Sequence, residues 1–139
     1  MEGLTLSQSE KGTPAWTLKS RYAILHEDEQ RAALTEPLME FYKEGRAVSR
    51  VTALSGDVET ETHDVRLSSS VVFDSFEDQS RLTTTELLYD SKRGLFTTQA
   101  DVLIRRPDGV LHGRGLEAKP DMSEIRIFNQ NSVMNGTSR

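Results

Sequence analysis

The sequence contains no cysteine, which excludes a disulfide scaffold, a thiol nucleophile and a cysteine-ligated zinc site. It also has no run approaching the ~20 consecutive apolar residues that a membrane-spanning helix needs. Its first residues, Met1, Glu2 and Gly3, lack the pattern of a signal peptide. These absences leave open whether the chain works in the cytoplasm or in a bacterial periplasm.

Apolar residues and positive charge are also scarce. Only 35% of the 139 residues are hydrophobic, which is typical of a flat pair of β-layers in which each strand has one wet face. The net charge of −5, with no basic cluster, argues against a nucleic-acid partner. The length fits one domain over residues 1–139, and we expect residues 3–134 to be structured and 135–139 to form a tail.

Alternation of apolar and polar residues with a period of two is the main structural signal. The residues on one side of three such runs are Trp16, Leu18, Ser20, Tyr22 and Ile24; Val65, Leu67, Ser69, Val71 and Phe73; and Phe96, Thr98, Ala100, Val102 and Ile104. Because successive side chains of a strand point to opposite faces, each run predicts a strand with one buried face. Polar segments, most with Gly or Pro, separate the runs at 26–29, 43–45, 90–94, 106–109 and 119–121. The fold class is therefore all-β, an antiparallel sandwich or jelly roll.

The bulky residues assigned to the inward face are interleaved with small ones such as Ser20, Thr84 and Ala100. This pattern fits two structures that composition does not separate: a packed core, or an open apolar trough in which each buried CH₂ of an acyl chain is worth about 0.8 kcal/mol. The residues expected to line this interior are Trp16, Leu18, Tyr22, Ile24, Phe41, Val71, Phe73, Leu82, Tyr89, Phe96, Val102, Ile104, Leu116 and Ile127, with Phe128 beside them.

The two ends of the chain have the features of sheet edges. The predicted edge residues are Leu4 and Leu6 near the start and Ile125, Phe128 and Val133 near the end, and the segments 4–6 and 129–133 carry little charge. Because unblocked edges are available for pairing with another chain, we expect partners to bind there by strand addition.

Two glycines within a predicted strand, Gly113 and Gly115, indicate a bulge or a close approach of the backbone. A bulge shifts the register by one residue and reverses the faces that follow it. We expect such shifts near Gly113 and near Glu86.

No group of residues carries recognisable chemistry. His26, His63 and His112 lie far apart without the spacing of a metal site, and we expect all three at the surface. Acidic residues such as Asp57 and Glu59 alternate on one wet strand face, whereas glycoside hydrolysis needs two carboxylates facing each other across a cleft. We therefore predict no enzyme, no catalytic residue, no metal and no cofactor.

The order of several short motifs resembles the LptC family of lipopolysaccharide export proteins, over about residues 3–134. The motifs are Trp16-x-Leu18 with Ala23, Leu34-x-x-Pro37, Leu82-x-Thr84, Leu87-x-Tyr89-Asp90, Gly109, Gly113-x-Gly115-Leu116-Glu117 and Ile125-x-Ile127. The resemblance implies a twisted, V-shaped jelly roll without catalytic activity. Related proteins of the LptA type share this fold, so a soluble LptA-like bridge is an alternative.

The resemblance also implies partners. A protein of this family accepts lipopolysaccharide from an inner-membrane ABC transporter, paired with the N-terminal edge, and passes it to LptA at the C-terminal edge. It works in the periplasm, and its family carries an N-terminal membrane helix that this chain lacks. Two alternatives stay open: a structural scaffold that only joins partners by strand addition, and a homodimer through the same strand edges.

Overall fold

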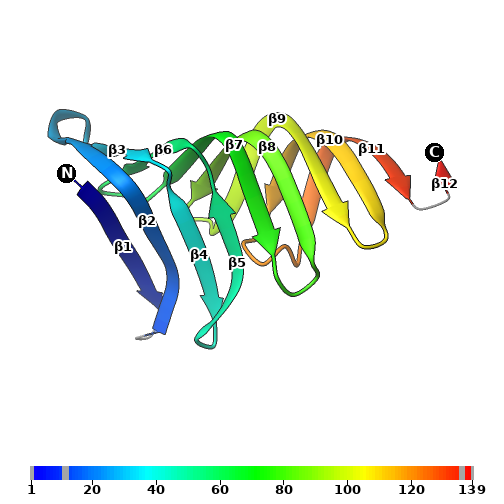
Figure 1. The fold of residues 1–139 in the computed structure, drawn as a ribbon, viewed down its shortest axis with the longest axis horizontal. Helices are drawn as coiled ribbons and strands as arrows, with labels where there is room; N and C mark the ends of the chain where they lie inside the picture. Colours follow the sequence, from blue (N-terminus) through cyan, green and yellow to red (C-terminus); the bar gives the residue numbers. More distant parts are fainter. Residues whose placement is uncertain (1, 11–12, 135–136, 139) are drawn as a thin grey trace.

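The computed structural model describes residues 2–10, 13–134 and 137–138, and it is built from a single antiparallel sheet (Figure 1). The sheet has twelve strands: β1 Glu2–Glu10, β2 Thr13–His26, β3 Arg31–Thr35, β4 Leu38–Lys43, β5 Arg46–Thr52, β6 Ser55–Glu59, β7 Val65–Ser75, β8 Ser80–Asp90, β9 Leu95–Arg106, β10 Gly109–Ala118, β11 Ile125–Met134 and β12 Thr137–Ser138. One 3₁₀ turn, η1 (Glu27–Glu29), is the only helical segment among the described residues. The predicted all-β class is confirmed.

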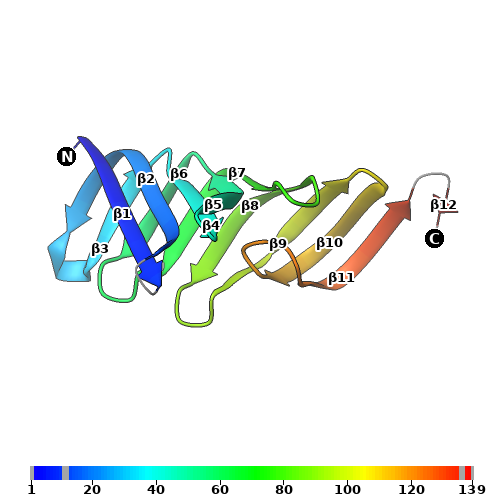
Figure 2. The ribbon, with the colours of Figure 1, turned by 90° about the horizontal axis from the view of Figure 1, so that it is seen from below.

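Two long strands, β2 and β7, fold the N-terminal half into two layers. Residues 16–19 of β2 pair with β4, whereas residues 22–26 pair with β3. In β7, residues 72–75 pair with β5 and residues 65–68 pair with β6. Because β4 also pairs with β5, and β3 with β6, each layer is continuous from β2 to β7, and the two long strands join the layers (Figure 2).

A line of bulges continues this division through the C-terminal half. Register shifts occur in β7 between Ser68 and Val71, in β8 between Thr84 and Leu88, and in β10 between Arg114 and Leu116. Because a bulge bends its strand and increases the local twist, each long strand can contribute its two ends to different layers. The shifts in β8 and β10 lie near Glu86 and Gly113, where the sequence indicated that a bulge could change the register, whereas the shift in β7 was not predicted. We call this line the crease, and the opposite side, where the layers diverge, the mouth.

The two layers are defined by their pairings. The first layer contains β4, β5 and residues 13–19, 71–75, 80–84, 102–106, 109–114 and 129–134. The second layer contains β3, β6 and residues 22–26, 65–68, 86–90, 95–98, 116–118 and 125–127. Together they form the V-shaped jelly roll that the family resemblance implied.

Apolar side chains fill the space between the layers. Leu18, Met39, Phe73 and Phe96 are completely inaccessible to solvent. Aromatic rings from both layers meet at the centre: Phe96 lies with its centroid 4.8 Å from that of Phe73 and 5.0 Å from that of Tyr89. Of the two interiors that the sequence left open, the packed core is the one present in this structure.

Three residues assigned to the interior face outward instead. Tyr22 is 45% exposed and Ile24 is 52% exposed, because β2 changes partner between residues 19 and 22 and turns Ala23 inward in their place. Phe128, 57% exposed, lies opposite the bulge at Gly115 and covers it from outside. The predictions that these three side chains line the interior are wrong, and each error comes from a break in strand register.

Ser69 shows the same effect in β7. The alternating pattern placed it inward, but Ser69 and Ser70 form the bulge with backbone φ of 68° and 52°, and both are exposed. Of the predicted tail, residues 135, 136 and 139 lie outside the described residues, whereas Thr137 and Ser138 form β12 against the end of β11.

Candidate functional site

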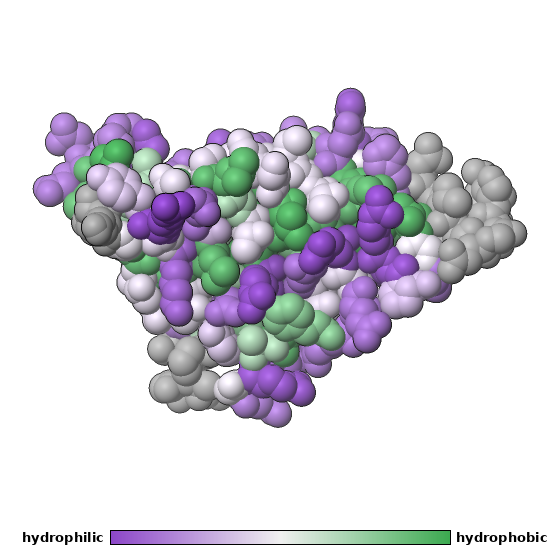
Figure 3. Space-filling model, viewed as in Figure 1, coloured by the Kyte–Doolittle hydropathy of each residue, from purple (hydrophilic) through white to green (hydrophobic). Residues whose placement is uncertain are grey.

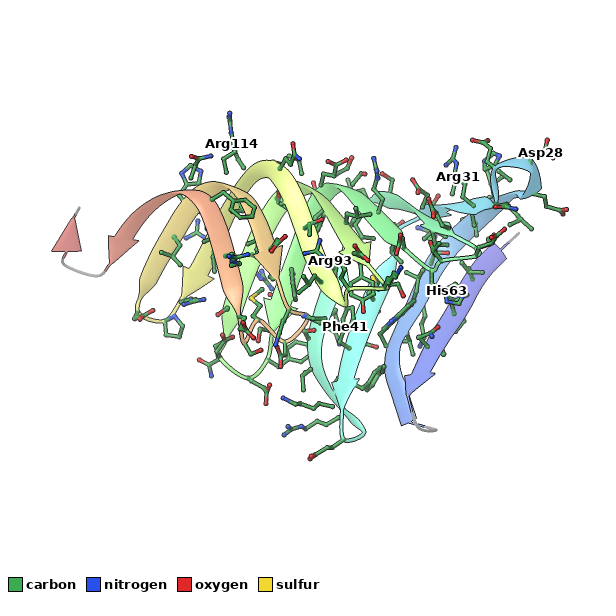
Figure 4. The ribbon with its side chains drawn as sticks, turned by 180° about the vertical axis from the view of Figure 1, so that it is seen from behind. Asp28, Arg31, Phe41, His63, Arg93 and Arg114 are labelled. Atoms are coloured by element: carbon green, nitrogen blue, oxygen red, sulfur yellow. The ribbon has the colours of Figure 1, made fainter. Side chains whose placement is uncertain are left out.

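A pocket of about 300 Å³ opens at the mouth, between the β4–β5 hairpin of the first layer and the β8–β9 hairpin of the second. Its apolar walls come from Ala15, Trp16, Phe41, Val48, Tyr89 and Leu95, and its polar rim includes Lys43, Arg93, Lys119 and Asp121. Phe41 and Arg93 are labelled in Figure 4. We call this hollow the mouth pocket; its walls continue inward into the aromatic cluster of the core.

The cations at the rim of the mouth pocket are paired with carboxylates. Arg93 Nη2 lies 3.1 Å from Glu117 Oε2, and Lys43 Nζ lies 3.5 Å from Asp121 Oδ2. Lys119 pairs with Glu124. The pocket therefore combines an apolar wall with a charged but balanced border, an arrangement that suits an amphiphile better than a simple anion.

Tyr89 occupies the boundary between the mouth pocket and the core. Burial, with the negative charges of Asp90 and Asp64, raises the pKa of Tyr89 to about 12. Its ring makes edge contacts with Trp16 at 5.8 Å and Phe41 at 5.2 Å between centroids. The phenol is thus neutral at physiological pH, and it joins the two layers through ring contacts.

Most residues predicted to line the interior lie together in one core. Those that are buried are Trp16, Leu18, Phe41, Val71, Phe73, Leu82, Tyr89, Phe96, Val102, Ile104 and Leu116, and Ile127 packs against them from a partly buried position. Of these, Trp16, Phe41 and Tyr89 also line the mouth pocket. Their role in binding lipid stays a prediction.

Sequence reasoning missed the loop between β10 and β11 as part of this site. It identified 119–121 only as a turn, yet Met122 is 4% exposed and belongs to the core. The available signal was Met122, a single apolar residue inside a polar turn. One apolar residue does not predict burial unless the elements that the turn packs against are known.

The predicted partner edges are the two ends of the sheet. β1 pairs on one side with β2, and Leu4 and Leu6 pack against the core from partly buried positions. β11 pairs with β10 and, at Val133 and Met134 alone, with β12. Ile125 packs against the core as well, whereas the side chain of Val133 lies outside the described residues. The edges lie at opposite ends of the long axis (Figure 1).

The structure gives a steric or conformational reason for glycine at both predicted structural positions. A Cβ on Gly113 would collide with Ile127 Cγ2 and lie 2.9 Å from the backbone oxygen of Asn129. Gly115 has a φ of +84°, and a Cβ there would lie 2.9 Å from Phe128 Cδ2. Both positions therefore permit the close packing of β11 on β10.

The outer surface also carries hollows, one of them of about 430 Å³ and lined by residues that include Arg66, Glu86, Leu88 and Phe128. Figure 3 shows small apolar patches separated by polar side chains on the face in view. Within the described residues there is no group of three or more His, Cys, Asp or Glu side chains that could hold a metal ion. Nor does that part of the chain contain a helix with the length and apolar character to cross a membrane.

Comparisons with known proteins agree with this architecture. The model of the family described as "Lipopolysaccharide-assembly, LptC-related" matches residues 1–134. A search among curated proteins finds no match. The fold is similar to the crystal structure of LptH from Pseudomonas aeruginosa, described as the LptA-homologous periplasmic component of the lipopolysaccharide transport device, with a TM-score of 0.63, 7% identity and 82% of each chain covered. At that identity the likeness concerns the fold alone.

Proposed function

Because the chain belongs to the LptC-related family of lipopolysaccharide-assembly proteins, we propose that it receives lipopolysaccharide and passes it through its interior to a neighbouring jelly roll. The observation that carries this proposal is the geometry of the sheet. Its apolar interior runs along the long axis, and its open edges β1 and β11 lie at the two ends of that axis.

Strand addition at these edges would align the interior of this protein with that of each partner. We assign β1 to the jelly roll of the inner-membrane ABC transporter and β11 to LptA. Backbone hydrogen bonds would set the register, and Leu4, Leu6 and Ile125 lie where they could extend the apolar lining across each junction. Lipid would then move between aligned interiors without crossing water.

Lipid can enter this packed interior only if the layers separate. The crease is held by paired backbone, whereas none of the strand pairings among the described residues joins the two layers across the mouth. Opening at the mouth therefore costs side-chain contacts but no sheet hydrogen bonds. Each buried CH₂ of an acyl chain would offset part of that cost by about 0.8 kcal/mol.

The same assignment implies the location. We propose that the domain works in the periplasm and that the full protein is tethered to the inner membrane by a helix outside this chain. Membrane fractionation of the full-length protein tests the tether, with release by carbonate as the result that contradicts it.

Photo-crosslinking to lipopolysaccharide tests the lipid path. A photoreactive phenylalanine would replace Phe73 or Phe96, which are buried, or Arg66, which is exposed on the outer face. We expect adducts at the two core positions and none at Arg66. Equal labelling at all three positions would point to surface adsorption.

The packed core also supports a second candidate, a scaffold that joins partners by strand addition and carries no lipid. This function predicts no adducts at Phe73 or Phe96 in the folded protein. Deletion of β11 separates the two functions further, because a lipid carrier should still bind lipid without that strand whereas a scaffold loses its partner.

A further inference from the structure

The loop between β10 and β11, residues 119–124, crosses the mouth from the second layer to the first. The residues that flank it, Ala118 and Ile125, pair with each other in the second layer. Its middle is bound to the first layer, where Ser75 Oγ donates a hydrogen bond to the Asp121 carbonyl at 3.3 Å and Lys43 Nζ lies 3.5 Å from Asp121 Oδ2. We call this loop the strap.

The strap inserts Met122 into the core. Met122 is 4% exposed and has a φ of +60°, a backbone conformation that residues other than glycine rarely adopt. The turn is held by hydrogen bonds from the Met122 amide to the Lys119 carbonyl (2.8 Å) and from the Lys119 amide to the Glu124 carbonyl (3.0 Å). Because a strained residue persists only where its surroundings enforce it, the inward position of Met122 is the feature that this turn maintains.

The connections of the strap to the first layer are weak. Lys43 is more than half exposed, and ion pairs of this kind contribute little to stability. Burial of Asp121 opposes its charged form, but hydrogen bonds from Ser123 and the pairing with Lys43 outweigh burial and lower the pKa of Asp121. The strap is therefore charged at neutral pH and joined to the first layer by one ion pair and one hydrogen bond.

We propose that the mouth pocket is the site where an acyl chain enters, and that Met122 is a plug that the acyl chain displaces. This inference rests on the proposed function and adds to it the place and control of access. The methionine side chain is unbranched, flexible and apolar, so it can occupy the space of a short piece of acyl chain and leave it readily. Arg93 and Lys119 at the rim would remain beside the polar headgroup outside the pocket.

The sole tryptophan, Trp16, provides the test because it is 3% exposed and lines the mouth pocket. A lysophospholipid with a brominated acyl chain, which quenches tryptophan on contact, would be mixed with the full chain in a stopped-flow instrument. The variants are Met122→Ala, next to the pocket-lining residues 119–121 of the strap, and, as the matched control, Met39→Ala, which removes a buried methionine of β4 outside the strap.

We expect Met122→Ala to quench about tenfold faster than the unchanged protein, the factor expected if the plugged state holds about nine-tenths of the population. Met39→Ala should leave the rate unchanged. Equal rates for the unchanged protein and Met122→Ala would overturn the plug while leaving the proposed function intact. Absence of quenching in every folded protein would overturn both.

A second variant keeps the test decisive if Met122→Ala does not fold. Asp121→Asn removes the charge that pairs with Lys43, but its side-chain oxygen can still accept the Ser123 amide hydrogen bond, which is 2.9 Å long. We expect faster quenching with Met122 still in place. An unchanged rate in this variant would contradict a strap that controls access.

Discussion

Replacement of Gly113 by alanine tests whether β10 and β11 pack as closely as the structure indicates. The added Cβ would collide with Ile127 Cγ2 and lie 2.9 Å from the Asn129 carbonyl oxygen, closer than ordinary van der Waals contact. Because one of these neighbours is backbone, side-chain rotation cannot relieve the collision and β11 has to move. The φ of Gly113 is not in the left-handed region, so the cost comes from crowding rather than from the conformation of the new residue.

The magnitude follows from two opposing effects. Overpacking lowers the free energy of unfolding by about 1–3 kcal/mol. Replacing glycine in a strand by alanine raises it by about 0.5–1 kcal/mol. We expect Gly113→Ala to lower the free energy of unfolding by about 1–2 kcal/mol. With a urea slope of about 2 kcal/mol/M, the midpoint should fall by about 0.5–1 M.

The assay is urea unfolding followed by circular dichroism, with hydrogen exchange to locate the change in β11. A double-mutant cycle with Ile127→Ala identifies the cause, because removing the Ile127 side chain relieves one of the two collisions. We expect the double variant to be more stable than the sum of the single effects predicts, by about 1 kcal/mol. An unchanged midpoint for Gly113→Ala would refute the close approach, and strict additivity would refute the role of Ile127.

Three further changes test other parts of the fold. Ser49 is completely buried and its hydroxyl has no hydrogen-bond partner among the described residues, so Ser49→Ala should stabilise the protein by about 1 kcal/mol in urea unfolding. The folded pKa of Tyr89, about 12, lies above its ordinary value of 10.0, so stability present below pH 10 should be lost as pH rises toward 12. The loss should reach about 2 kcal/mol and be absent from Tyr89→Phe, as compared by unfolding midpoints at pH 8 and pH 11.5. A Cβ on Gly56 would lie 2.5 Å from the Arg66 carbonyl oxygen, so Gly56→Ala should separate β6 from β7 and speed amide exchange in β6, whereas protection equal to the unchanged protein would contradict this pairing.

The fold class follows from the sequence because alternation is a local property. Each of the three alternating runs lies in a strand, and the residues before the first break in each run face as the pattern predicts. Trp16 and Leu18 are buried, but Tyr22 and Ile24, farther along β2, are not. Alternation with a period of two predicts which side chains are buried only along the part of a strand that keeps the same neighbouring strand.

The changes of partner could not be located so well, because they depend on strands distant in sequence. β2 leaves β4 for β3 after residue 19, and nothing in its own residues marks that point. In β10, by contrast, Gly113 and Gly115 mark the bulge, since no side chain fits at the first and the second has a left-handed φ. The break in β7, by comparison, lies at Ser69 and Ser70, two serines that do not interrupt the alternating pattern.

In the candidate site, too, the features that depend on local sequence were predictable and those that depend on distant residues were not. The core side chains were predictable because burial within a strand leaves a periodic pattern, and Phe41, Phe73 and Phe96 all meet at the centre. The strap was not predictable, because its significance lies in Ser75 and Lys43, which are 46 and 78 residues away from Asp121. The turn at 119–124 can close the mouth only because residues of the first layer bind it. For a fold whose layers are joined at the crease by continuous strands and share no strand pairing at the mouth, control of access therefore falls to the loops, where sequence periodicity carries least information.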